Sequence, residues 1–230
     1  MKSIKVIGFD ADDTLWSNAV YFKEAEQVFQ RLLMPYVSLD TLKTELYATE
    51  SKNMEWYGYG AMAFTLSMIE TAIRVTGGAV SADIIADIMQ AGRSILEKPI
   101  ELFPGVREVL PQLQHQYRLV VVTKGDLLDQ ERKLNNSGLV PYFQHIEVVS
   151  EKHEANYEQL VQFMGIQPAE FLMVGNSLKS DVIPVLSIGG HAVHVPYEME
   201  WVHEMAEKPQ KPYHEIPTLF HLPEILGALL

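Results

Sequence analysis

Hydrophobic and polar residues follow two different patterns along this chain, and the change of pattern divides it. Between residues 17 and 98, apolar residues recur every three or four positions, which predicts the buried faces of amphipathic α-helices. A further helix is expected between 39 and 52, while Gly77-Gly78 predicts a helix end and Ser81 a cap for the next helix. The predicted buried faces are Tyr21, Ala25, Val28 and Leu32; Met62, Leu66, Ile69 and Ile73; and Ile84, Ile88, Ala91 and Ile95.

Outside this segment, short apolar runs alternate with helical patterns. The alternation predicts an α/β fold, a doubly wound, Rossmann-like parallel sheet covered by helices on both faces. Residues 17–100 are therefore predicted to form an α-helical cap domain inserted after the first strand, and residues 1–16 and 101–230 to form one α/β core. The predicted strands are 4–9, 117–122, 145–149, 171–174 and 192–195; the predicted helices are 106–114, 127–137, 155–164 and 180–188, and a surface loop at 208–217 precedes a terminal helix at 222–229.

The overall charge narrows the classes of partner. The 230 residues carry a net charge of -12, which argues against a general nucleic-acid binder and against binding to anionic membranes. The absence of cysteine excludes disulfides and thiolate metal sites and fits a reducing compartment. The first ten residues lack the apolar region of a signal peptide, and no apolar stretch approaches the length of a membrane span. A cytoplasmic protein is the default expectation, while the sequence leaves the oligomeric state open.

The first predicted strand ends abruptly in the acidic segment Asp10-Ala11-Asp12-Asp13-Thr14. Ionised carboxylates are costly to desolvate without a partner, so this position indicates chemistry or a bound cation. Asp10 and Asp12 are placed either to hold a divalent cation between them or to divide a nucleophile role from an acid/base role. An Asp-rich turn is the simpler alternative. A calcium loop of the EF-hand type is excluded, because its sixth and twelfth positions would be Leu15 and Tyr21 instead of Gly and Glu.

Polar residues also follow the other main strands. Ligands of an open parallel sheet bind outside the carboxyl ends of its strands, so these residues are expected to converge. They supply carboxylates, a hydroxyl, an amide and ammonium groups, which together indicate a metal-assisted phosphate site. The residues after the second, third and fourth strands are Thr123 and Lys124; Glu151 and Lys152; and Asn176 and Asp181.

The order Asp-x-Asp, Thr, Lys and Gly-Asn-x-x-x-x-Asp resembles the haloacid dehalogenase superfamily, in its phosphatase-like branch with a helical cap. The resemblance implies a sheet order of 5-4-1-2-3 with the first strand in the centre. It implies Mg²⁺-dependent hydrolysis of a small phosphorylated metabolite, a phosphomonoester, through an aspartyl-phosphate. Asp10 would be the nucleophile and Asp12 the acid/base that protonates the leaving oxygen and later activates water.

The resemblance also assigns the remaining motif residues. Thr123 and Lys152 would hold phosphoryl oxygens, and Mg²⁺ would be carried by Asp10, the Asp12 carbonyl and either Asn176 or Asp181. Asn176 stands where an Asp is more usual in the family, which leaves Asp181 as the firmer expected ligand. Asp12 argues against haloacid dehalogenation, because the family's dehalogenases lack an acid at that position.

Three alternatives stay open at this point. A phosphomutase of the same fold would retain the aspartyl-phosphate and return the phosphoryl group. A receiver-like domain would accept a phosphoryl group without turnover, although the helical insertion has no place in it. A non-catalytic phospholigand-binding regulator is supported only by Asn176.

Other polar and aromatic residues permit two interpretations each. Lys124 would either touch phosphate or be solvated, and the stretch Trp56-Tyr57-Gly58-Tyr59-Gly60, expected between cap helices, would either pack or line a substrate pocket. The odd separation of His191 and His194 on a strand places them on opposite faces, which argues against a shared metal ion.

Overall fold

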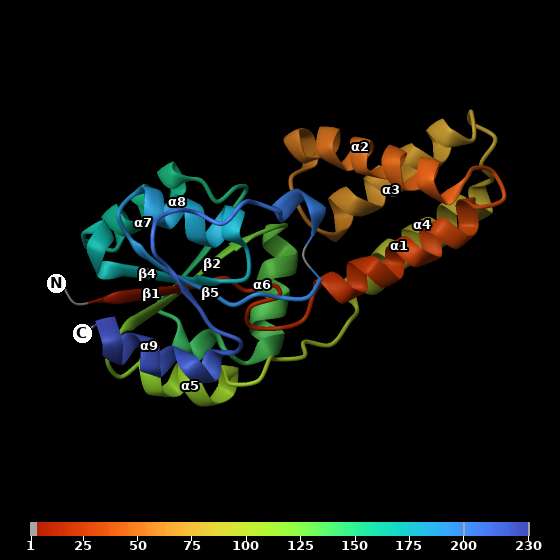
Figure 1. Cartoon of the computed structure of the whole chain (residues 1–230). Coiled ribbons are helices and arrows are strands. Elements are labelled where there is room, and N and C mark those ends of the chain that lie inside the picture. Colours follow the sequence, from red (N-terminus) through yellow and green to blue (C-terminus); the bar gives the residue numbers. More distant parts are fainter. Residues whose placement is uncertain (1–3, 200, 230) are drawn as a thin grey trace. The chain divides into compact units, whose positions relative to one another are not determined.

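A computed structural model describes residues 4–199 and 201–229 of the chain (Figure 1). The described residues leave out residues 1–3, 200 and 230. These belong to the predicted core segments 1–16 and 101–230. The chain forms two compact units. One consists of Met1–Ser17, Ile100–Lys124 and Gln130–Leu230, and the other of Asn18–Pro99 with Gly125–Asp129.

The first unit is built on a six-stranded parallel sheet in the order β3-β2-β1-β4-β5-β6. The predicted order 5-4-1-2-3 is confirmed, with β1 in the centre. The sheet has one strand more than predicted, because residues 214–215 of the expected loop at 208–217 pair with the end of β5. The strands are β1 (Val6–Phe9), β2 (Arg118–Lys124), β3 (His145–Val149), β4 (Phe171–Gly175), β5 (His191–His194) and β6 (His214–Glu215).

Helices cover both faces of this sheet, as predicted (Figure 1). Alternate strand residues point to opposite faces, so Ile7 and Phe9 of β1 pack with one helical layer and Val6 packs with the other. The first layer contains α5 (Val106–Leu113), α6 (Leu127–Ser137) and α9 (Leu222–Leu229), and the second contains α7 (Glu154–Phe163) and α8 (Ile183–Ser187).

The helix predicted at 180–188 is interrupted. A π-helical turn at Leu178–Val182 precedes the short α8. Pro184 has no N–H to donate to the carbonyl of Ser180, four residues earlier, and the hydroxyl of Tyr157 donates to that carbonyl instead, at 2.9 Å. π-Turns inside helices are frequent at functional sites, and this one carries Asp181.

The second unit consists mainly of four helices, α1 (Ala19–Leu33), α2 (Leu39–Tyr57), α3 (Ala61–Val75) and α4 (Ala82–Leu96). Ser81 caps α4 as predicted, since its side chain accepts a hydrogen bond from the N–H of Ile84. α2 is five residues longer than predicted, so Trp56 and Tyr57 belong to its last turn and not to a loop. No helix of the described ranges 4–199 and 201–229 is long and apolar enough to cross a lipid bilayer.

The predicted buried face of α3 is wrong at three of its four positions; the fourth, Ile69, packs partly buried against the core of the helical unit. Met62, Leu66 and Ile73 are exposed, whereas Phe64 and Met68 face the core of the helical unit. The inner face also contains Ser67 and Thr71, which a hydrophobicity pattern scores as polar and therefore as exposed. Both are buried, because their hydroxyls are hydrogen-bonded.

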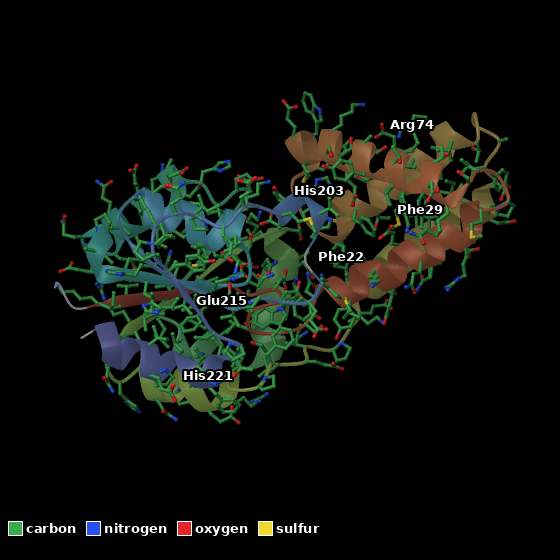
Figure 2. The ribbon with its side chains drawn as sticks, viewed as in Figure 1. Phe22, Phe29, Arg74, His203, Glu215 and His221 are labelled. Carbon is green, nitrogen blue, oxygen red and sulfur yellow. The ribbon has the colours of Figure 1, made fainter. Side chains whose placement is uncertain are left out.

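On α1 the predicted Ala25 is buried and Tyr21, Val28 and Leu32 pack partly buried against the core, but the deepest contacts are made by Phe29 (labelled in Figure 2) and Leu33, which were not predicted. Ile88, Ala91 and Ile95 of α4 are buried as predicted.

α2 and α3 meet through neutral polar side chains. The Asn53 amide donates to the Ser67 hydroxyl at 3.2 Å, and the Thr71 hydroxyl donates to the Thr49 hydroxyl at 2.9 Å. Arg74 (Figure 2) extends this row, because its guanidinium donates to Thr49 Oγ1 at 2.6 Å. These groups are paired within the helical unit, which accounts for their burial.

Candidate active site

A buried ion-pair cluster lies at the carboxyl end of the central strands. Asp10 directly follows β1, and its N–H donates to the carbonyl of Val174 on β4 at 2.9 Å. The ammonium of Lys152, from the segment after β3, donates to Asp10 Oδ1 at 2.5 Å and to Asp181 Oδ1 at 2.7 Å. The side chains of these three residues are nearly inaccessible to solvent. Two carboxylates therefore share one ammonium in a desolvated site.

Burial shapes the titration of this cluster. It raises the pKa of Asp10 from 3.8 to about 7, because the loss of hydration outweighs the attraction of Lys152 and because Asp181 adds repulsion. Burial opposes the charged form of Lys152 too, but the carboxylates of Asp10 and Asp181 raise the pKa of its ammonium above the ordinary value. Lys152 is therefore a permanent cation at neutral pH, available to an anionic ligand.

The turn after β1 folds back onto Asp10. Asp13 adopts a left-handed backbone conformation with φ of 62°, which Asp tolerates better than most residues. Its N–H donates to the carbonyl of Trp16 at 2.7 Å. Within this turn, the Thr14 hydroxyl lies 3.0 Å from Asp10 Oδ2 and 3.3 Å from Asn176 Oδ1. Asp10 and Asn176 thus present an oxygen each to the same hydroxyl group.

Both carboxylate oxygens of Asp181 are engaged. Oδ1 accepts from Lys152, and Oδ2 accepts from the N–H of Ser177 at 3.0 Å. Gly175 is required at the end of β4, since a Cβ there would overlap the Asp181 carboxylate. Asp181 accordingly serves as the partner that fixes Lys152.

The loop that carries Asn176 is held from β5 and β6. His194 Nε2 lies 2.9 Å from the carbonyl of Asn176, and His194 Nδ1 lies 3.1 Å from the carboxylate of Glu215, the residue labelled in Figure 2. His194 is buried at the end of β5. The unpredicted strand β6 thereby supports the site through Glu215.

Asp12 faces α6 and not the Lys152 cluster. The ammonium of Lys133 lies 2.8 Å and 2.7 Å from its two carboxylate oxygens. Trp16 Nε1 donates to Oδ1 at 2.7 Å, and Gln130 Nε2 donates to Oδ2 at 2.8 Å. The carboxylate of Asp12 is therefore held by three side chains.

The end of β2 contributes a second ion pair. Thr123 is buried, and its hydroxyl lies 3.4 Å from the carbonyl of Lys124. Lys124 is not a solvated lysine, since its ammonium binds Glu204 at 2.5 Å and the Ser180 hydroxyl at 3.0 Å. Burial opposes ionisation of Glu204, but Lys124 and the hydroxyls of Ser180 and Ser177 hold the pKa of Glu204 below its usual range.

The structure thus brings four of the six predicted site residues into one hydrogen-bonded set, namely Asp10, Lys152, Asn176 and Asp181. Among residues that the sequence interpretation missed, Thr14 lies within the acidic motif itself, and Gln130 and Lys133 are three apart on a predicted helix. Glu204 lies in a segment with no motif and carried no signal that would have identified it.

The donor set fits Mg²⁺ better than a softer ion. Within residues 4–199 and 201–229, no group of three or more His, Cys, Asp or Glu side chains converges to hold a metal ion. Asp10 Oδ2 and Asn176 Oδ1 offer one carboxylate oxygen and one amide oxygen beside a common hydroxyl. Such a sparse oxygen set suits Mg²⁺, which keeps several waters and shares its sphere with substrate phosphates.

Known proteins match this chain in sequence and structure. It is 25% identical over 170 residues to the human N-acylneuraminate-9-phosphatase, a match over 70% of this chain and 66% of that protein. The chain therefore spans just under two thirds of that relative's length. It is 26% identical over 239 residues to the glyceraldehyde 3-phosphate phosphatase of Pyrococcus furiosus, over 100% of this chain and 94% of that protein.

A solved structure agrees over almost the whole chain. A haloacid dehalogenase-like family hydrolase from Xanthomonas campestris is 40% identical, with a TM-score of 0.89, and the match covers 99% of this chain and 92% of that chain. The sequence profile of the haloacid dehalogenase-like hydrolases matches residues 4–189. The chain therefore belongs to the haloacid dehalogenase-like hydrolases, as its motifs predict.

Proposed function

We propose that this protein hydrolyses a small-molecule phosphomonoester in a Mg²⁺-dependent reaction that passes through an aspartyl-phosphate on Asp10. The observation that carries the proposal is the buried contact of Asp10 with Lys152, at the strand end where Thr14 and Asn176 also meet. The relatives named as phosphatases support this class of reaction. The substrate is a small phosphorylated metabolite.

Asp10 and Asp12 divide the chemistry. In the first step, which requires Asp12 in its protonated form, a carboxylate oxygen of Asp10 attacks phosphorus while the bond from phosphorus to the ester oxygen breaks, and Asp12 gives that oxygen its proton. In the second step, water attacks phosphorus and the bond to Asp10 breaks, while Asp12 takes the proton from the water. Inorganic phosphate leaves, and both carboxyl groups return to their starting forms.

The remaining cluster neutralises and orients the phosphoryl group. Lys152 supplies a fixed ammonium for phosphoryl oxygens, and Asp181 holds that ammonium in place. The hydroxyl of Thr123 serves as a second contact to the phosphoryl oxygens. Because phosphoryl transfer depends mainly on positioning and charge neutralisation, a rigid, desolvated lysine suits this role.

Mg²⁺ would be held by Asp10 Oδ2, Asn176 Oδ1 and the carbonyl of Asp12. When bound, the ion neutralises charge on the phosphoryl oxygens and on Asp10. We rank Asn176 above Asp181 as a ligand, because the Asp181 oxygens bind the Lys152 ammonium and the Ser177 N–H, whereas Asn176 Oδ1 and Asp10 Oδ2 share only the Thr14 hydroxyl among the described residues. This reverses the ranking expected from the sequence.

The test is release of inorganic phosphate by the full chain with Mg²⁺ and, separately, with EDTA. The panel contains para-nitrophenyl phosphate, glyceraldehyde 3-phosphate, N-acylneuraminate 9-phosphate and other phosphorylated metabolites. We expect Mg²⁺-dependent release from the aryl ester and at least one metabolite. Absence of release from every ester, or transfer of the phosphoryl group to a sugar phosphate in place of water, would contradict the proposal.

A further inference from the structure

The carboxylate of Asp12 is partly buried and makes several hydrogen bonds, including those with α6, and is not part of an exposed surface ion pair. Lys133 bridges both carboxylate oxygens, at 2.8 and 2.7 Å, and the side chains of Lys133 and Asp12 are only 12% and 20% exposed. Trp16, whose ring is fully buried, adds a donor to Oδ1. An exposed ion pair contributes little, but this one is partly desolvated and made of several charge-assisted hydrogen bonds.

The amide of Gln130 is locked in one orientation. Its Nε2 donates to Asp12 Oδ2 and to the carbonyl of Lys124, both at 2.8 Å. Its Oε1 is buried and has no hydrogen-bond partner among the described residues. Flipping the amide would turn this oxygen toward two acceptors, so Gln130 presents only its N–H₂ group to Asp12.

We propose that Lys133 and Gln130 are positioning residues that set the orientation of the Asp12 carboxylate. The role rests on the proposed phosphomonoesterase, in which Asp12 exchanges a proton with the leaving oxygen. Lys133 spans both carboxylate oxygens, which prevents rotation of the carboxylate plane, and Gln130 and Trp16 fix its two edges. A misplacement of about 1 Å in a reacting group costs about 10²-fold in rate.

This role predicts a specific pattern of rate loss. An alkyl phosphate requires protonation of its leaving oxygen, whereas the para-nitrophenolate anion leaves readily without it. Loosening Asp12 through Lys133→Met should therefore lower kcat for glycerol phosphate by about 10²-fold, and for para-nitrophenyl phosphate by about threefold. KM should stay nearly constant for both substrates, because Lys133 is not assigned a contact with the phosphoryl group.

The experiment compares Lys133→Met, Lys133→Arg and the matched control Lys5→Met. Lys5 is also ion-paired, to Glu170 at 2.8 Å, but it lies at the amino end of β1, away from Asp12. Lys133→Arg should recover much of the loss on glycerol phosphate, since a guanidinium can also bridge a carboxylate. Lys5→Met should keep wild-type kcat on both substrates. Thermal unfolding of each variant shows whether it is folded, and Gln130→Met replaces Lys133→Met in the test if the latter does not fold.

The outcomes separate this inference from the proposed function. Equal losses on the two substrates, or no recovery in Lys133→Arg, would reduce Lys133 to a structural ion pair and overturn the assignment. If the wild-type protein with Mg²⁺ hydrolyses no ester of the panel, the proposed function fails and the inference fails with it. Wild-type turnover combined with a Lys133→Met variant that behaves like Lys5→Met overturns only the inference.

Discussion

The two units of this protein bury polar side chains in opposite ways. In the α/β unit the buried polar groups include several charged ones, and Lys152 contacts both Asp10 and Asp181 at the carboxyl end of the strands. In the helical unit they are mainly neutral and pair along the α2–α3 contact, as Thr49 does with Thr71. Neutral pairs cost little to bury once they are satisfied, whereas buried charges are expensive. We attribute the burial of charged groups at the strand end, which costs free energy of folding, to their use in catalysis.

The pKa of Asp10 shows how unfavourable the burial of charge is at the strand end. Burial raises it to about 7, even though an ammonium lies 2.5 Å away. A strongly raised pKa beside a specific charged partner is typical of functional sites, and Asp10 combines both features. The contrast predicts that changes at the strand end abolish activity, and that changes in the helical row reduce only stability.

The largest expected effect is loss of turnover in Asp10→Asn. The amide keeps the shape of the side chain but is a poor nucleophile, so kcat should fall by about 10³-fold or more. Circular dichroism and thermal unfolding should show a folded protein. Phosphate release at near wild-type rates from this variant would remove Asp10 from the mechanism.

The same substitution should stabilise the protein in the absence of metal. The folded-state pKa of Asp10, about 7, lies above the ordinary value of 3.8, so stability is lost as pH rises through this interval. Asn carries no such penalty. Asp10→Asn should therefore unfold at a higher temperature than wild type at pH 8 in EDTA, and the difference should shrink toward pH 4. A difference that does not change with pH would contradict the raised pKa.

Asp181→Asn should lower activity with little change in Mg²⁺ requirement. Lys152 and Ser177 donate to different oxygens of Asp181, and the amide replaces one of these oxygens by an NH₂ donor and removes the charge, so Lys152 is held less firmly and kcat falls by about 10²-fold. Activity measured against Mg²⁺ concentration should give a half-saturation within about threefold of wild type. Asn176→Ala is the matched comparison and should raise that concentration by about tenfold or more. Equal shifts in the two variants would make Asp181 a metal ligand.

Thr49→Val tests the helical row. The isosteric change removes an acceptor of the Thr71 hydroxyl and of Arg74, which should cost about 1–3 kcal/mol of unfolding free energy. Urea denaturation measures this loss. The kcat of the folded variant should equal that of wild type, and a specific loss of kcat would assign this row a role in catalysis.

Trp56→Ala should have the smallest effect on stability, within about 0.5 kcal/mol, because the side chain is 73% exposed at the end of α2. Exposure of Trp56 and of its neighbour Tyr57 argues against a packing role, and substrate selection stays a prediction for both. Their replacement should alter preference among metabolite esters while hydrolysis of para-nitrophenyl phosphate is unchanged. Uniform kinetics across the whole panel would exclude that role.

Much of the α/β unit was predictable from the sequence, because buried parallel strands read as apolar runs and end at a shared edge. That rule places Asp10, Lys152, Asn176 and Asp181 together before any coordinates are known. The outer strand β6 was not predictable, since two paired residues in a proline-rich stretch leave no periodicity. The π-turn at Leu178–Val182 was not predictable either, since its Ser180 carbonyl is bonded by the hydroxyl of Tyr157, in a distant segment.

The helical unit shows why periodicity alone misjudges a face. A hydrophobicity pattern predicts that Ser67 and Thr71 are exposed and that Met62 is buried. It does so because it takes no account of the hydrogen bonds that a side chain makes within the folded unit. Lys133 and Glu204 were missed for a related reason. Each is defined by what it binds across the fold, Asp12 in one case and Lys124 in the other.

The central claim is that the phosphoryl group passes onto Asp10, and rapid chemical quench of the enzyme with a ³²P-labelled alkyl phosphate tests it most directly. The account predicts hydroxylamine-labile label on the peptide that contains Asp10, formed and lost at rates that match turnover, and absent in Asp10→Asn. Steady turnover with no label on the protein, or label on another residue, would contradict the aspartyl-phosphate mechanism.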